Sequence, residues 1–140
     1  MRPVSHTYVD SVRAPVVQVF AALTDPVRIP KWLPGCDSID SAGPFKKGGK
    51  FTAHFGQRTS EFEIVDYAPP ATFGWTERGQ RKGTKLFLRL DVTGATTAVT
   101  VREVWTPRGF VAWVRGRFFE RRHVQQRLQK IVQNLRALLG

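Results

Sequence analysis

From Cys36 to Pro107, apolar and polar side chains alternate with a period of two, and beyond Pro107 the apolar residues recur near the 3.6-residue period of a helix. Clusters of glycine and proline interrupt the alternating region at short intervals, as turns between antiparallel strands do. This order predicts successive strands followed by one long helix. The strands are expected near 37–42, 49–56, 59–67, 71–78, 83–93 and 97–106, and the helix from about 110 to 139, which Gly116 could divide.

The N-terminal part of the chain predicts one more strand and two short helices. Residues 4–13 alternate and end before the restricted Ala14-Pro15 step, so we predict a first strand there. Pro15 suits the first turn of a helix. After it, one apolar helix face is formed by Val16, Val19, Phe20 and Leu23. A second short helix is expected over 27–33, although Pro30 limits its regularity.

The terminal helix is the only predicted element large enough to cover the apolar face of the sheet. Its apolar stripe consists of Val114, Phe118, Val124, Leu128, Ile131, Leu135 and Leu138. A strongly bent sheet cannot touch a straight helix along its whole length, so an apolar hollow is expected where the two diverge. The alternative is a solid core filled by phenylalanine and tryptophan. The predicted fold class is α+β: a curved antiparallel sheet of about seven strands, two short helices after the first strand, and a long C-terminal helix over an apolar cavity.

Length and composition restrict the function classes. The 140 residues suit a single domain over 1–140, and 10 Phe and 4 Trp supply bulk for a core. The single cysteine, Cys36, excludes an internal disulfide and is expected to be a buried small hydrophobe. His6, His54 and His123 lie far apart in the sequence, so we predict no metal site and no cofactor. With no apolar run of membrane-spanning length and no secretion signal, a cytoplasmic protein is expected.

Two acidic residues share a strand face with apolar residues. Glu77 is in phase with Phe73 and Trp75, and Glu103 is in phase with Val101. A carboxyl group buried in apolar surroundings can act as a general acid or base, so both glutamates are candidate catalytic residues. The alternative is structural: each glutamate lies near a strand end and pairs with Arg78, Arg102 or another surface arginine.

The residues expected to contact a ligand occupy inward strand positions, the entrance between helix and sheet, or the start of the covering helix. They are Trp32, Phe51, Phe55, Tyr67, Phe73, Trp75, Leu88, Val101, Trp105, Phe110, Trp113 and Phe118. Most are aromatic or aliphatic, as in small-molecule pockets generally, and Tyr67 adds a polar group that could orient a ligand. His54 is out of phase with Phe51 and Phe55, so we expect it to face away from the cavity.

Basic residues dominate the charge. Lysine and arginine outnumber aspartate and glutamate 22 to 11, for a net charge of +11. Between 108 and 139, Glu120 is the only acidic residue among many basic ones, namely Arg108, Arg115, Arg117, Arg121, Arg122, Arg127, Lys130 and Arg136. This segment could contact a polyanion such as RNA, or an anionic membrane surface. A solvated helix face is the alternative, and the oligomeric state stays open.

Three segments carry a family resemblance: Val12 to Trp32, with its Ala-Pro, Leu-Thr-Asp-Pro and Trp spacing, Gly48 to Phe51, and Asp66 to Phe73. They resemble the SRPBCC superfamily, the helix-grip group of START-like and polyketide cyclase/dehydrase-like proteins. Trp32-Leu33-Pro34-Gly35-Cys36 is also similar to the branch of this group that is associated with carbon-monoxide dehydrogenase, which leaves the subfamily open.

The resemblance implies an apolar cavity between sheet and C-terminal helix, which the group uses for lipids, sterols, quinones and polyketides. We therefore expect binding of a hydrophobic or aromatic small molecule. One alternative is a cyclase- or dehydratase-like enzyme that uses a buried glutamate. Another is an interaction module, similar to co-chaperone-like or ribosome-associated relatives, that uses the arginine-rich surface.

Overall fold

A computed structural model describes residues 3–78, 83–106 and 121–139. In chain order its elements are β1 (Val4–Val12), α1 (Val16–Leu23), α2 (Ile29–Trp32), β2 (Ser38–Ser41), β3 (Lys50–Phe55), β4 (Arg58–Ala68), β5 (Thr72–Glu77), β6 (Lys85–Thr93), β7 (Thr96–Trp105) and α4 (Arg121–Leu139). This order confirms the α+β helix-grip architecture expected from the sequence. Within the residues described, no helix combines the length and apolar character needed to cross a bilayer.

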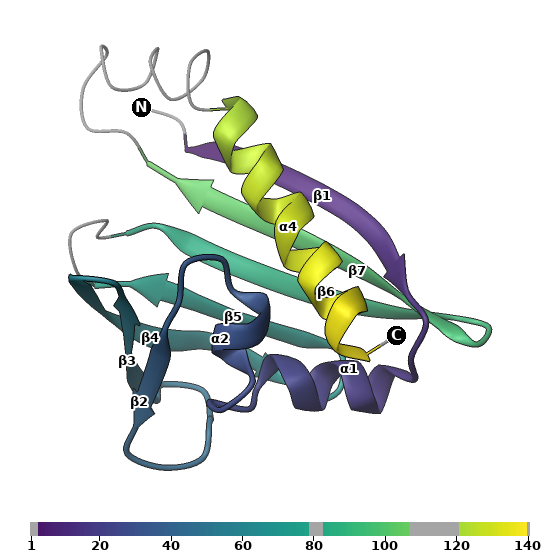
Figure 1. The fold of residues 1–140 in the computed structure, drawn as a ribbon, viewed down its shortest axis with the longest axis horizontal. Coiled ribbons are helices and arrows are strands. Elements are labelled where there is room, and N and C mark those ends of the chain that lie inside the picture. Colours follow the sequence, from purple (N-terminus) through teal and green to yellow (C-terminus); the bar gives the residue numbers. More distant parts are fainter. Residues whose placement is uncertain (1–2, 79–82, 107–120, 140) are drawn as a thin grey trace.

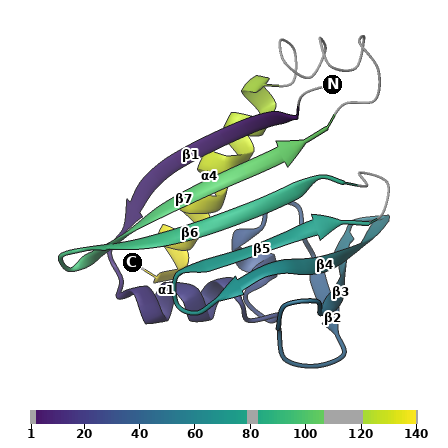
Figure 2. The same ribbon diagram turned by 180° about the vertical axis from the view of Figure 1, so that it is seen from behind.

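The seven strands form one antiparallel sheet in the order β1-β7-β6-β5-β4-β3-β2. Figure 1 shows α4 lying across this sheet on the same side as α1 and α2. We call this side the inner face and the opposite side the outer face. Figure 2, which turns the molecule around, shows the strands in front with the labelled helices behind them.

Strand alternation decides which side chains reach the inner face. In β7, Val99, Val101 and Glu103 are buried, whereas Arg102 between them is exposed. The alternation predicted for this strand is thereby confirmed. Burial of one face drives the sheet to pack against the helices, because apolar surface removed from water contributes roughly 25 cal/mol per Å².

The long terminal helix packs its apolar stripe on β1, β7 and α2. Its buried residues are Leu128, Ile131, Val132 and Leu135. Two polar contacts hold its C-terminal half: Asn134 Nδ2 donates to the carbonyl of Trp32 at 3.1 Å, and Arg136 Nε donates to the carbonyl of Ser11 at 2.8 Å. The predicted helix is confirmed over 121–139, while its predicted start over 110–120, with Gly116, lies outside the described residues.

The short helix α2 spans Ile29–Trp32, a shorter segment than the 27–33 expected. Trp32 anchors it, because the indole is fully buried and its Nε1 donates to the carbonyl of Ala22 at 3.0 Å. The same ring stacks on Trp75 of β5, with ring centroids 6.0 Å apart. This packing holds the following residues, Leu33 and Pro34, over the inner face.

One irregularity in β4 was not expected from the sequence. The pairing register between β4 and β5 shifts between Ile64 and Asp66, as at a β-bulge. One extra residue reverses the phase of the strand, so Tyr67 faces inward although it is an odd number of residues from Ile64. Its ring lies 5.6 Å from that of Phe20 and 6.3 Å from that of Phe73.

Candidate functional site

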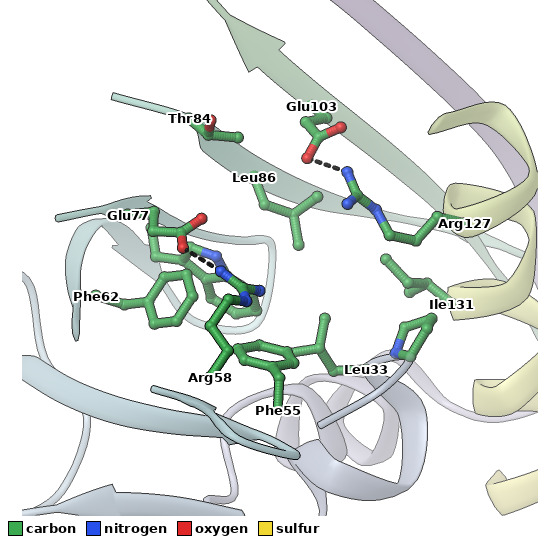
Figure 3. A pocket seen from close by; sticks show the side chains of 12 residues that line it. Leu33, Phe55, Arg58, Phe62, Glu77, Thr84, Leu86, Glu103, Arg127 and Ile131 are labelled. Carbon is green, nitrogen blue, oxygen red and sulfur yellow. Dashed lines mark hydrogen bonds and ion pairs between the residues drawn. The ribbon is translucent and has the colours of Figure 1, made fainter. Parts of the chain in front are cut away.

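A cavity of about 100 Å³ lies on the inner face, between the sheet, α4 and the segment after α2 (Figure 3). The expected hollow between sheet and terminal helix is therefore present. It is smaller than most small-molecule pockets, which have volumes of about 300–1,000 Å³. Its lining residues are Leu33, Pro34, Phe55, Arg58, Phe62, Trp75, Glu77, Thr84, Leu86, Glu103, Arg127 and Ile131.

Cross-strand pairing places the strand residues of the cavity in two neighbouring rows. The first row runs across β4, β5 and the residue before β6, through Phe62, Glu77 and Thr84. The second row runs across β5, β6 and β7, through Trp75, Leu86 and Glu103. Since alternate residues of a strand face the same side, residues distant in sequence meet at one place on the inner face.

Glu77 ends β5 with a buried side chain, and Arg58 provides its counter-charge. Arg58 Nη1 donates to Glu77 Oε1 at 2.9 Å, and Ser60 Oγ donates to the same oxygen at 2.8 Å. The Arg58 guanidinium also lies over the ring of Phe55, 4.5 Å from its centroid. A charge removed from water needs such a partner and such donors. Among the described residues, no hydrogen bond reaches Glu77 Oε2.

A second ion pair joins the sheet to the terminal helix. Glu103 faces the cavity from β7 and is buried, and Arg127 of α4 donates to its Oε1. Arg127 and Ile131 lie one helical turn apart and therefore reach the same cavity. Both candidate catalytic glutamates thus pair with arginine, as the structural alternative held. Among the described residues their ion-pair partners are Arg58 and Arg127, not Arg78 or Arg102.

His6 of β1 lies directly opposite Glu103 of β7 and is also buried. Burial lowers the pKa of the imidazole below its ordinary 6.5, the Glu103 carboxylate acts against this shift, and Arg121 and Arg127 add to it. A histidine that favours its neutral form therefore stands beside the Glu103–Arg127 pair. From the sequence, His6 was weighed only as a metal ligand, although it alternates in phase with Tyr8 and Val12 within 4–13.

The structure separates the predicted ligand-contacting residues into three groups. Phe55 and Trp75 line the cavity together with the two candidate glutamates. Several others are packed in the closed core or beside it and do not line the cavity, namely Trp32, Phe51, Tyr67, Phe73, Leu88, Val101 and the half-buried Trp105. The predicted residues Phe110, Trp113 and Phe118 lie outside the described part of the chain.

Many predicted ligand-contacting residues do not line the cavity, and this has a physical reason. Alternation shows which face a side chain points to, but it does not show whether a neighbour fills the space above that face. Phe51 illustrates this, because it stacks on Phe45 at 5.1 Å and on Phe62 at 5.2 Å. Phe73 stacks on the same Phe45 at 5.8 Å. Phe45 lies in the segment between β2 and β3, where the sequence has no periodic pattern that would predict its burial.

Sequence reasoning missed the arginines and the hydroxyl of the cavity. Arg58 is in phase with Phe62 along β4, which was the signal available for it. Arg127 stands beside Leu128 at the border of the apolar stripe of α4. Thr84 precedes β6 in phase with Leu86 and is buried. From the sequence alone, all three look like ordinary polar residues, because only the structure shows which element lies opposite each of them.

Within the described residues, the arginine-rich surface is smaller than the sequence suggested, while Arg108, Arg115 and Arg117 lie outside the described part of the chain. Arg127 is bound to Glu103, and Arg136 forms an ion pair with Asp10 of β1. The cationic residues of α4 that remain exposed are Arg121, Arg122, Lys130 and Arg136 itself. Two of the cations proposed for polyanion contact therefore serve to attach the helix to the sheet.

His54 and Cys36 occupy the positions expected for them. His54 lies off the cavity, and its Nε2 is 2.7 Å from Asp40 Oδ2. Cys36 is buried in the core, and burial raises the pKa of its thiol to about 11. Such a thiol behaves as a small hydrophobe and not as a nucleophile at neutral pH.

Comparison with known families gives one match over almost the whole chain. The family described as "Polyketide cyclase / dehydrase and lipid transport" matches residues 3–140. Among curated proteins, no relative matches the sequence.

Solved structures with the same fold are more numerous, but their sequences differ widely from this one. The Aha1 dimer from Colwellia psychrerythraea has a TM-score of 0.75 and 17% identity, over 97% of this chain and 96% of that one. Protein NE0264 from Nitrosomonas europaea has a TM-score of 0.77 and 14% identity, over 96% and 92%. DynU16, from the dynemicin biosynthetic locus, has a TM-score of 0.73 and 21% identity, over 95% of this chain and 46% of that one. At these identities the likeness establishes the fold alone.

Proposed function

The chain belongs to the polyketide cyclase/dehydrase and lipid transport family, within the SRPBCC superfamily, and we propose that it binds a hydrophobic or aromatic small molecule in the cavity beneath α4. The proposed ligand classes are lipids, quinones and polyketide-like compounds. The observation that carries the proposal is the cavity itself, where an aromatic wall meets two buried carboxylates. Removal of apolar ligand surface from water would supply the affinity, and the polar groups would select the orientation.

Native mass spectrometry of freshly purified protein tests the proposal without a guess about the ligand. A co-purifying small molecule at stoichiometric occupancy is the expected result. Quenching of tryptophan fluorescence by a panel of flat aromatic compounds and fatty acids provides the second measurement, because Trp75 lines the cavity. Binding should change little as salt rises, whereas binding of a polyanion to surface arginines would weaken steeply.

A matched pair of variants locates the binding site. Leu86→Phe adds volume inside the cavity, and Val92→Phe adds bulk on the same strand at a position that is 65% exposed. We expect Leu86→Phe to abolish or strongly weaken binding and Val92→Phe to leave it unchanged. If both variants bind like the original protein, the ligand lies elsewhere and the proposal is wrong.

Catalysis is the second candidate function, because Glu77 and Glu103 line the same cavity. In a cyclase- or dehydratase-like reaction one of these carboxylates would move a proton while the cavity holds a reactive chain in a folded conformation. The test is turnover of a compound recovered from the purified protein, measured for Glu77→Gln and Glu103→Gln. Unchanged turnover in both variants would exclude this role.

A further inference from the structure

Thr84 carries a polar atom that the fold leaves unsatisfied. Its Oγ1 is buried and has no hydrogen-bond partner, the only such side-chain atom within the residues described. The residue is 5% exposed and lines the cavity. Buried hydroxyl groups are nearly always hydrogen-bonded, so an unsatisfied hydroxyl on a residue that lines a cavity favours a partner that occupies the cavity.

Glu77 stands directly opposite Thr84 and completes a polar corner. The backbone N–H of Glu77 donates to the carbonyl of Thr84 at 2.8 Å, which holds the two residues side by side on the inner face. Both hydrogen bonds that Glu77 accepts from described residues reach Oε1, from Arg58 and Ser60, and Oε2 stays available. A hydroxyl group of a ligand can accept from Thr84 and donate to Glu77 at the same time.

The other described walls leave room inside the cavity for one ring of a ligand. Phe62 and Trp75 meet edge to face, with centroids 5.7 Å apart, and both border the cavity with Leu86 and Ile131. The cavity volume is about 100 Å³, and an engineered apolar cavity of about 150 Å³ is known to bind benzene. An aromatic ring therefore matches both the size and the chemistry of these walls.

Among the cavity-lining residues that the structure describes, each carboxylate is matched by one arginine. Glu77 is paired with Arg58, and Glu103 with Arg127. The site therefore does not call for a charged group on the ligand, since burial of an additional unpaired charge is costly. A neutral hydroxyl group fits this corner better than a carboxylate, which would approach the acceptor oxygen of Glu77.

We infer that the cavity takes the ring of a phenol, with its hydroxyl group between Thr84 and Glu77 and its ring against Phe62 and Trp75. The inference rests on the proposed function, because it names the ligand class of the same cavity. The phenol can be a free molecule or the end of a larger ligand. In either case the orphan hydroxyl of Thr84 serves recognition and not stability.

Isothermal titration of the full chain with three matched probes tests the inference: p-cresol, toluene and 4-methylbenzoate. We expect p-cresol to bind about tenfold more tightly than toluene, the size of effect that one or two net hydrogen bonds produce. Thr84→Val removes the hydroxyl at nearly constant shape. It should weaken p-cresol binding about tenfold and leave toluene binding unchanged, while Thr84→Ser should restore the preference.

Thermal unfolding provides an independent readout. Without ligand, Thr84→Val should raise the Tm, because the variant no longer buries an unsatisfied hydroxyl. For the titration experiment, Arg78→Gln is the matched control. Arg78 pairs with Glu63 away from the cavity, so this variant should keep the preference for p-cresol over toluene. A lower Tm for Thr84→Val would show that the hydroxyl already serves the fold and would overturn the inference.

Each other outcome is decisive as well. Equal affinities of p-cresol and toluene in the original protein would show that Thr84 and Glu77 do not bind the hydroxyl group, which overturns the inference. The proposal that the cavity binds a small molecule would still stand. Tightest binding of 4-methylbenzoate shows that the arginines select the ligand, which also overturns the inference. Absence of binding by all three probes overturns it too, and native mass spectrometry then decides separately whether the cavity holds some other molecule.

Discussion

Arg58 and Glu77 are 19 positions apart in the chain, yet Arg58 Nη1 donates to Glu77 Oε1 at 2.9 Å on the inner face of the sheet. The arginine side chain is about one-third exposed, at 32%, and the glutamate side chain is 5% exposed. The pair therefore has one solvated end and one buried end. Loss of the arginine would leave the buried end without its counter-charge.

Replacement of the arginine should accordingly destabilise the fold. We expect Arg58→Met to lower the free energy of unfolding by about 1–3 kcal/mol, because Ser60 would remain as the only described donor to Glu77 Oε1. Urea unfolding monitored by circular dichroism measures the change. Arg78→Met serves as the control, since it breaks the more exposed pair with Glu63 and should cost less than about 1 kcal/mol.

The double variant gives the sharper test of this pair. Arg58→Met combined with Glu77→Met removes both charges, so the combined loss should be smaller than the sum of the two single losses. Strict additivity would show that the two side chains are energetically independent in spite of their contact.

The outer face offers a second prediction, at Gly74 of β5. The ring of Phe87 on the neighbouring strand lies over this glycine, and a Cβ placed there would come within 2.6 Å of Phe87 Cδ1 and 3.1 Å of the Leu86 carbonyl. The guanidinium of Arg102 covers the same ring, 5.1 Å from its centroid. Gly74→Ala should therefore destabilise the protein by about 1–3 kcal/mol through overpacking, as measured by thermal or urea unfolding.

The clash with the ring can be separated from the backbone effect. In a Phe87→Ala background the main obstacle is gone, and Gly74→Ala should then be neutral or stabilising, because alanine loses less backbone entropy than glycine on folding. The same cost in both backgrounds would contradict the steric explanation.

Stability should depend on pH through His6. Burial lowers the pKa of this imidazole below 6.5, against the opposing effect of Glu103 and with the support of Arg121 and Arg127. The unfolded state therefore binds the proton first as pH falls. The contribution of neutral His6 is complete above about pH 6.5 and is lost as pH falls from there through the pKa of the folded state.

Two measurements check this prediction. The Hε1 resonance of His6 should titrate with a midpoint below 6.5. The fall in unfolding free energy on acidification should be shallower in His6→Gln than in the original protein. A midpoint above 6.5, or identical slopes in the two proteins, would show that burial does not govern this histidine.

Cys36 should be chemically quiet in the folded protein. Its thiol has a pKa of about 11 because it is buried, so at pH 8 only about one molecule in a thousand carries the thiolate. Alkylation by iodoacetamide, followed by mass spectrometry, should be slow in buffer and fast in concentrated guanidinium chloride. Val27→Cys is the control, because residue 27 is 76% exposed and the new thiol should react at once. Rapid native labelling of Cys36 would contradict the assigned burial.

Local pattern was sufficient for most of the fold. The alternation of β7 and the apolar stripe of α4 predict which side chains turn inward, because side-chain direction follows from backbone geometry alone. For the same reason the inward positions of Glu77 and Glu103 could be read from the sequence. The phase of Tyr67 could not, since the β-bulge beyond Ile64 depends on pairing with β5.

The partners across the inner face were settled only by tertiary structure. Arg127 contacts Glu103, 24 residues away, because α4 crosses β7 near Glu103. The periodicity of either element alone does not predict where the two cross. The size of the cavity depends in the same way on how Trp32, Phe45 and Phe51 fill the surrounding space. Sequence determines the face to which a side chain points, since that is a property of one strand or one helix. What the side chain meets there is a property of two elements, and only their packing decides it.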